Sequence, residues 1–178
     1  MKTRFFTYWL ILCLLPILSS CEKEEEGDLI WDFSTRSIML KVVNASGQNM
    51  LDESTANGWK AEDISATYKD ESYPCTIVDE PLYQPQSDIP TRYLPAFMRG
   101  LRTSTEKQNR ILYFGDFTPT NNYKDTPITY HWPDGTTTTI TFDFYITWKS
   151  KKDPVVTFKC YLNGKELPQD KGVITIQK

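Results

Sequence analysis

The chain has 178 residues, of which 20 are Lys or Arg and 23 are Asp or Glu, so its formal net charge is −3. This length suits one domain with a self-supporting core. No basic cluster is present that could follow a phosphate backbone, so the sequence disfavours nucleic acid as a partner.

Residues 1–20 have the three parts of a secretory signal peptide. Lys2 and Arg4 form a short positive region, and a mostly apolar run follows from 5 to 18. That run is too short for a comfortable membrane span, which needs about 20 residues. Ser19 and Ser20 are small, as a processing site requires. Removal of this segment leaves 18 basic and 23 acidic residues, so the expected charge of the mature chain is −5.

The sequence Leu18-Ser19-Ser20-Cys21 resembles the lipobox of bacterial lipoproteins. The resemblance implies cleavage between Ser20 and Cys21, followed by acylation of Cys21 as the first residue of the mature chain. Two or three acyl chains hold a protein stably at a bilayer, whereas one chain binds only marginally. The alternative is an ordinary secretory signal that happens to precede a cysteine.

An acidic run follows the cysteine, with Lys23 ahead of Glu24, Glu25 and Glu26. It is similar to the export tag of Bacteroidetes surface lipoproteins, and the whole chain resembles the small members of that group. The resemblance implies an outer-membrane protein that faces the outside of the cell. The alternative for residues 21–34 is a solvated acidic tether, because like charges repel and keep a chain extended. Both interpretations can hold together.

Alternating apolar residues predict β-strands in the remaining segment, 35–178, and no window shows a capped helical repeat. We expect strands at 37–44, 64–68, 72–78, 96–103, 110–117, 126–132, 136–148, 156–162 and 172–176. Turn signals separate many of these strands, and the clearest are Asn57-Gly58, Pro133-Asp134-Gly135 and Asn163-Gly164. The proline-rich segment 79–95 is expected to be a long loop, since proline removes a ladder donor.

The longest expected strand, 136–148, has one polar face and one apolar face that ends in Trp148. This alternation is typical of an antiparallel sheet with one buried face, so we expect Trp148 in the core. The predicted fold is a single all-β domain, an antiparallel β-sandwich that is immunoglobulin-like in the broad sense. A Greek-key barrel is the alternative.

Two cysteines remain once Cys13 has left with the signal and Cys21 is acylated. In an oxidising compartment the even pair Cys75 and Cys160 predicts a disulfide. The bridge would close a loop of about 85 residues and contribute roughly 4 kcal/mol in the chain-entropy model. The alternative is two buried thiols in neighbouring strands, because pairing needs a compatible geometry.

Little in the sequence suggests catalysis. His131 is the only histidine, which excludes a multi-histidine metal site, and no nucleophile motif accompanies it. Carboxylates are numerous, but no spacing identifies a glycosidase pair, and no calcium-loop pattern surrounds Asp28 and Asp32 in the tether. The sequence therefore predicts a protein without enzymatic activity, metal or cofactor.

Four aromatic residues are candidates for a binding surface. Trp59 and Trp132 adjoin expected turns, and Tyr83 and Tyr93 belong to the proline-rich loop. On a rigid scaffold, loop aromatics stack on sugars or anchor a protein partner. The alternative, which we favour at this point, is that these rings plug the ends of the sandwich.

The leading functional hypothesis is a non-catalytic cell-surface module, held to the membrane by its lipid, that binds a glycan or a surface protein. A second hypothesis is a fimbrillin-like structural subunit. Its basis is that fimbrillins are also lipid-exported β-sandwiches, and Arg36 is a candidate position where an arginine-specific protease would free a groove for strand donation. The small size and single domain count against it. A hydrolase is the third hypothesis.

Overall fold

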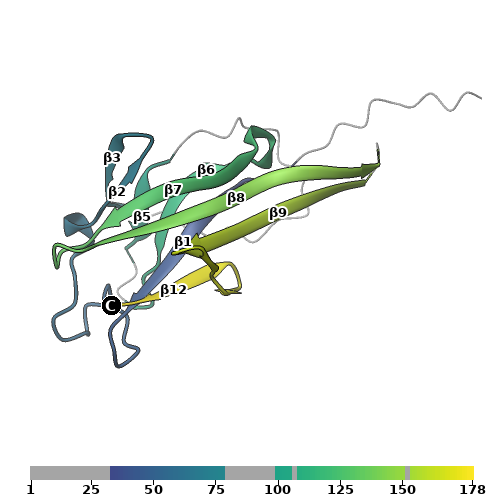
Figure 1. The fold of residues 1–178 in the computed structure, drawn as a ribbon. Coiled ribbons are helices and arrows are strands. Elements are labelled where there is room, and N and C mark those ends of the chain that lie inside the picture. The colour runs from purple at the N-terminus through teal and green to yellow at the C-terminus, as the bar shows by residue number, and fades with distance from the viewer. Residues whose placement is uncertain (1–32, 79–98, 106–107, 151–152) are drawn as a thin grey trace, which may run out of the picture. The chain divides into compact units, whose positions relative to one another are not determined.

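Two six-stranded β-sheets pack face to face around one apolar core (Figure 1). The structure, a computed structural model, describes residues 33–78, 99–105, 108–150 and 153–178, which belong to one compact unit. Sheet A has the order β11-β12-β1-β6-β5-β4, and sheet B has the order β10-β9-β8-β7-β2-β3. Among the described residues, no strand of one sheet pairs with a strand of the other. The predicted β-sandwich is therefore confirmed, and the alternative of a closed Greek-key barrel is wrong.

The strands of sheet A are β1 Arg36–Val43, β4 Thr76–Val78, β5 Leu101–Ser104, β6 Leu112–Phe117, β11 Gln169–Asp170 and β12 Val173–Gln177. Those of sheet B are β2 Ser65–Tyr68, β3 Glu71–Pro74, β7 Tyr123–His131, β8 Thr137–Ser150, β9 Asp153–Leu162 and β10 Lys165–Glu166. Two short 3-10 helices, η2 Ala61–Asp63 and η3 Pro119–Asn121, connect them. No helix in the described part of the chain is long and apolar enough to cross a membrane.

Strand β1 is the centre of sheet A and follows its predicted alternation. Ile38, Leu40 and Val42 are at most 1% exposed and face sheet B. β6 pairs with β1 in the antiparallel sense, whereas β12 pairs with it in the parallel sense, with Met39 opposite Val173. The parallel pairing of the first and last strands was not foreseen, because sequence alternation fixes faces but not neighbours.

The expected strand 72–78 is wrong, because the chain divides at Cys75. β3 pairs with β2 in sheet B, and β4 pairs with β5 in sheet A. Pro74 lacks a backbone N–H, so the edge ladder of sheet B ends there. The Cys75 N–H donates to the Ile64 carbonyl at 2.9 Å, and the chain then crosses between the sheets.

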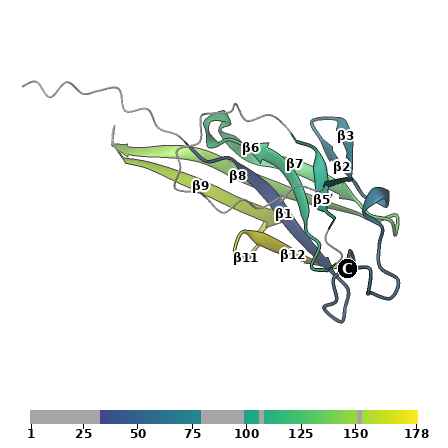
Figure 2. The same ribbon diagram turned by 180° about the vertical axis from the view of Figure 1, so that it is seen from behind.

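Strands β8 and β9 form a long hairpin that extends past β1 and β6 (Figures 1 and 2). In its inner part the alternation holds, with Ile140, Phe142 and Phe144 fully buried. Near its tip the prediction of a buried Trp148 is wrong, since this side chain is 50% exposed. β8 has 14 residues, whereas β1 and β6 have 8 and 6, so sheet A covers only part of it.

The predicted hairpin turns are confirmed. Gly135, at φ +77°, ends the turn between β7 and β8, where the Trp132 N–H donates to the Thr136 carbonyl at 3.0 Å. The Asp134 carboxylate accepts bonds from the hydroxyl and the N–H of Thr136, and these bonds lower its pKa. Asn163 and Gly164 both have positive φ, as a two-residue hairpin between β9 and β10 requires.

Candidate functional site

Eight of the predicted site residues lie outside the described residues. They are the cleavage and acylation positions, the export tag and the two loop tyrosines: Ser20, Cys21, Lys23, Glu24, Glu25, Glu26, Tyr83 and Tyr93. Asp28 and Asp32 also lie outside them. The roles predicted for these residues therefore stay predictions.

The structure brings Trp59 and Trp132 together in a column of three rings. The Trp59 and Trp132 rings stack at 5.6 Å between centroids, and Trp132 stacks on Tyr130 at 5.7 Å. Trp132 is 4% exposed, and its indole N–H donates to the Thr138 hydroxyl at 2.8 Å. Trp132 thus plugs this end of the sandwich, as the alternative interpretation held, and only Trp59 is left partly accessible.

The loop between β1 and η2 carries Trp59 and is organised by Asn49, which is 5% exposed. The Asn49 side-chain amide donates to the Arg110 carbonyl at 2.8 Å, and its oxygen accepts the Leu51 N–H at 3.1 Å. A buried amide whose donor and acceptor are both used fixes its neighbours strongly. The bonds tie the loop to the segment just before β6 and hold Leu51 in the core.

Gly58 lets this loop fold back closely on itself. A Cβ at this position would lie 3.0 Å from the Thr55 carbonyl oxygen and 3.1 Å from that of Met50. The next residue, Trp59, donates its N–H to the same Met50 carbonyl. The turn predicted at Asn57-Gly58 therefore sets the position of Trp59. Asn57 has the positive φ of such a turn.

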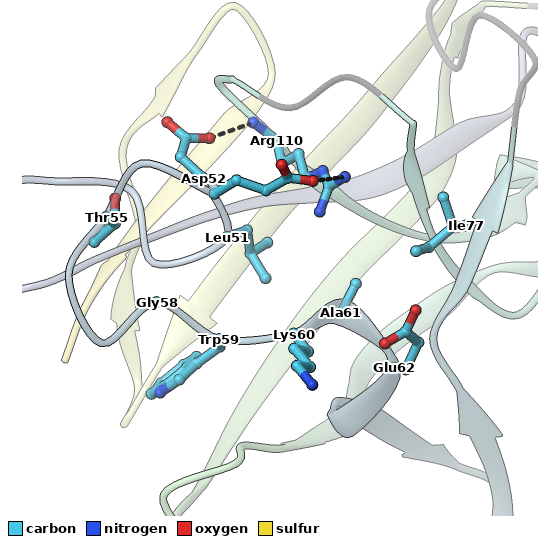
Figure 3. Close-up of a pocket in the computed structure, with 11 residues that line it drawn as sticks. Leu51, Asp52, Thr55, Gly58, Trp59, Lys60, Ala61, Glu62, Ile77 and Arg110 are labelled. Atoms are coloured by element: carbon cyan, nitrogen blue, oxygen red, sulfur yellow. Dashed lines mark hydrogen bonds and ion pairs between the residues drawn. The ribbon is translucent and has the colours of Figure 1, made fainter.

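An open pocket of about 430 Å³ lies between this loop, η2 and β4 (Figure 3). Leu51 and Ala61 are buried beneath it, and Ile77, 40% exposed, stands on the side opposite Trp59. Polar and charged side chains supply most of the remaining lining: Asp52, Glu53, Thr55, Lys60, Glu62 and Arg110. The pocket thus offers an aromatic ring, three apolar side chains and groups of both charges.

Arg110 is held at the rim from two sides. Its guanidinium lies 3.6 Å from a Glu53 carboxylate oxygen, and its backbone N–H donates to Asp52 at 3.0 Å (Figure 3). The Arg110 side chain is 11% exposed and that of Glu53 is 53% exposed. A guanidinium positioned before a ligand arrives loses little freedom on binding, which favours recognition of paired oxygens.

The predicted disulfide is wrong in this structure, because Cys75 and Cys160 are both buried free thiols. Cys160 lies on β9, whereas Cys75 follows β3 at the other side of sheet B, with β8, β7 and β2 between those strands. Four strand spacings amount to about 19 Å, well beyond the roughly 7 Å that a disulfide spans between Cα atoms. The two thiols are not in neighbouring strands either.

Burial raises the pKa of each thiol to about 12. For Cys75 the Glu62 carboxylate adds to the increase and Arg110 opposes it. For Cys160 the second contribution comes from Asp143. Both thiols stay protonated near neutral pH, so they are poor nucleophiles and poor metal ligands there.

His131 lies on β7 and is only partly buried. Its Nε2 is 2.8 Å from the Thr67 hydroxyl on the paired strand β2. Within the described ranges, no three His, Cys, Asp or Glu side chains come close enough together to hold a metal ion.

Arg36 begins β1, and its guanidinium lies 5.6 Å from the centroid of the Phe158 ring. Cleavage after Arg36 would leave the rest of β1 between β12 and β6. No strand of the described part would therefore leave a groove, so this position adds no support to strand donation.

Sequence reasoning found Trp59 but missed most of the pocket. Asp52, Glu53, Lys60, Glu62 and Arg110 come from two segments about 50 residues apart, and no spacing rule joins them. The only local signal was the Asn57-Gly58 turn beside Trp59. No family model, no curated protein and no solved structure matches the chain. What the site can do therefore follows from its own geometry.

Proposed function

We propose that this protein is a lipid-anchored binding module on the surface of a bacterial outer membrane, and that its pocket holds a glycan. The open pocket beside Trp59 is the observation that carries the proposal. Its volume matches a small saccharide rather than the flat contact of a large protein interface. The module needs no catalytic step to perform this role.

The chemistry of the lining suits a sugar. One face of Trp59 is stacked on Trp132, which holds the ring rigidly for apolar contact with a pyranose. Arg110, Asp52 and Glu53 offer donors and acceptors for neighbouring hydroxyl groups. Such a mixture of one aromatic platform and a few fixed polar groups is typical of small-molecule sites.

The predicted loop 79–95 extends this proposal. Ile77 lines the pocket, and β4 ends at Val78, the residue before the expected loop. Tyr83 and Tyr93 stay candidates for a second aromatic contact. Prolines in the loop reduce the entropy that it loses on binding.

A glycan array probed with the purified mature protein tests the binding role. Trp59→Ala should weaken the best ligand by about 1–3 kcal/mol, whereas Trp148→Ala, a partly exposed tryptophan outside the pocket, should not change it. Tyr83→Ala and Tyr93→Ala report on the loop in the same assay. Equal binding by the Trp59→Ala variant and the parent protein would reject the pocket as the site.

Anchoring is tested separately, on Cys21. Cys21→Ala should abolish lipid labelling and membrane retention, because the resemblance makes this thiol the acylation site. Replacing Lys23, Glu24, Glu25 and Glu26 with Ala should leave the protein in the membrane but protected from protease added to intact cells. Unchanged surface exposure would leave the acidic run as a tether only.

A further inference from the structure

We infer that the tip of the β8–β9 hairpin is a membrane-contact surface that lies on the lipid bilayer to which the protein is anchored. This hairpin-tip surface consists of Ile146, Trp148, Lys149, Pro154 and Val156. The inference rests on the anchoring part of the proposed function and adds an orientation to it.

The surface begins where sheet A stops covering sheet B. Trp148 is 50% exposed and Val156 is 42% exposed. They lie on the same face of the hairpin as the buried Phe144, since Val156 is opposite Ile146 and Pro154 is opposite Trp148. The apolar side chains of this face alternate as those of a core strand do, yet they are exposed to solvent. Such an exposed apolar face indicates a site that contacts another apolar surface.

The composition of the tip is that of a membrane interface. Tryptophan prefers the boundary between lipid and water, because its ring is apolar while its N–H needs a polar partner. The sequence from 149 to 153 is Lys-Ser-Lys-Lys-Asp, with three lysines and one aspartate. Lys149 is exposed, while Lys151 and Lys152 lie outside the described residues. A lysine beside an apolar contact, such as Lys149, favours an anionic lipid surface.

The anchor is expected on the same side. Phe33, the first described residue, meets Trp148 edge-on, with their ring centroids 6.3 Å apart. About 12 residues separate Phe33 from Cys21, and an extended segment of that length reaches at most about 40 Å. The expected anchor thus joins the described domain through Phe33, beside the hairpin tip.

The opposite end holds the glycan pocket. Thr137, beside the turn that follows Trp132, and Trp148 are near the two ends of β8, a span of about 36 Å at the usual rise per residue. With the tip on the bilayer, the pocket beside Trp59 is displayed away from the membrane. A site for extracellular glycans needs this orientation.

Quenching by brominated lipids tests the inference. The purified acylated protein is reconstituted in vesicles of phosphatidylethanolamine and phosphatidylglycerol with brominated acyl chains, which quench tryptophan only at short range. All proteins carry Trp31→Phe, because a tether tryptophan would be quenched in any orientation. We expect quenching in this parent, loss of most of it in Trp148→Phe, and full retention in the matched control Trp59→Phe.

A second pair of variants keeps tryptophan in place. Val156→Asp should reduce the quenching of Trp148, whereas Thr175→Asp, at an exposed position of β12, should not. Equal quenching in the parent and Trp148→Phe would overturn the inference. So would Trp148 shielded from aqueous acrylamide without bromine quenching, since a second copy or another part of the chain would then cover the tip.

Vesicle flotation separates this inference from the proposed anchor. Protein that fails to float has no functional lipid, and the anchor itself is then rejected. Protein that floats while Trp148 escapes the brominated chains is anchored without contact at the tip, and only the inference fails.

Discussion

The two ends of the long strand β8 each lie near a tryptophan. The sandwich buries one of these two side chains and leaves the other half-exposed. Trp132, beside the β7–β8 turn, is 4% exposed and stacks between Trp59 and Tyr130. Trp148, near the other end, is 50% exposed. Alternation assigned Trp148 to the core, which is wrong. Trp132 was a candidate for a binding surface, with a plug at the end of the sandwich as the favoured alternative, and it is buried.

The contrast shows what alternation measures. A period of two reports which face of a sheet a side chain takes, but it does not report whether another element covers that face. Trp148 has the face of a core residue, but sheet A does not cover it, because β1 and β6 are too short to reach it. Trp132 lies past the end of β7, yet the loop that carries Trp59 closes over it.

Alkaline pH should have the largest effect on stability, because it destabilises the core to which both ends of the sandwich belong. Burial raises the thiol pKa of Cys75 and Cys160 from 9.0 to about 12, and it also raises the pKa of Tyr130. Between pH 9 and 12 the unfolded chain releases protons that the folded chain keeps, so the free energy of unfolding falls as the pH rises. The fall is up to about 4 kcal/mol for each thiol.

Urea unfolding at a series of pH values measures this fall. The matched control, Cys75→Ala with Cys160→Ala, should lose less stability over the same range. Alkylation in urea without reductant should label both thiols of the parent protein. Protein that stays unlabelled would contain the disulfide that the structure lacks.

Trp132→Ala should have the next largest effect, a destabilisation of about 3–5 kcal/mol, because it empties a buried site. It also removes the stacking partner of Trp59 and leaves the Thr138 hydroxyl without its indole donor. Chemical denaturation measures the loss. A loss below about 1 kcal/mol would mean that this end is open, as the other end is.

Asn49→Ala should destabilise the protein by about 1–3 kcal/mol, because the Arg110 carbonyl and the Leu51 N–H both lose a buried partner. The pocket loop depends on those bonds, so glycan binding should weaken as well. Asn44→Ala, at the start of the loop in a turn away from the pocket lining, is the control for a local change. A variant that keeps full binding would show that the loop holds its shape without Asn49.

Trp148→Ala should have the smallest effect, at most about 1 kcal/mol in detergent solution, because half of the ring already meets solvent. Thermal unfolding of this variant beside Trp132→Ala makes the comparison direct. A loss close to that of Trp132→Ala would place Trp148 in the core after all.

Local chemistry made most strands predictable. β1 and β8 have clear alternation, and the Pro133-Asp134-Gly135 and Asn163-Gly164 turns need the backbone freedom that those residues give. Sheet membership was beyond the sequence, because it depends on which distant strands pair. The division at Cys75 shows this, since one short apolar run supplies both sheets.

The candidate site was less predictable than the fold. Trp59 could be singled out because a large ring beside a turn is conspicuous. Arg110 could not, because its role depends on Asn49, Asp52 and Glu53, which are distant in the sequence and meet it only in the folded protein. The disulfide prediction failed for a related reason, since cysteine parity carries no information on the distance between β3 and β9.

The pairing of β1 with β12 has a consequence for how the chain folds. Met39 and Val173 lie side by side although about 130 residues separate them, so sheet A has a high contact order. Its central strand keeps an open edge until the last residues of the chain arrive. The long hairpin β8–β9 is free to form earlier, because its contacts are local.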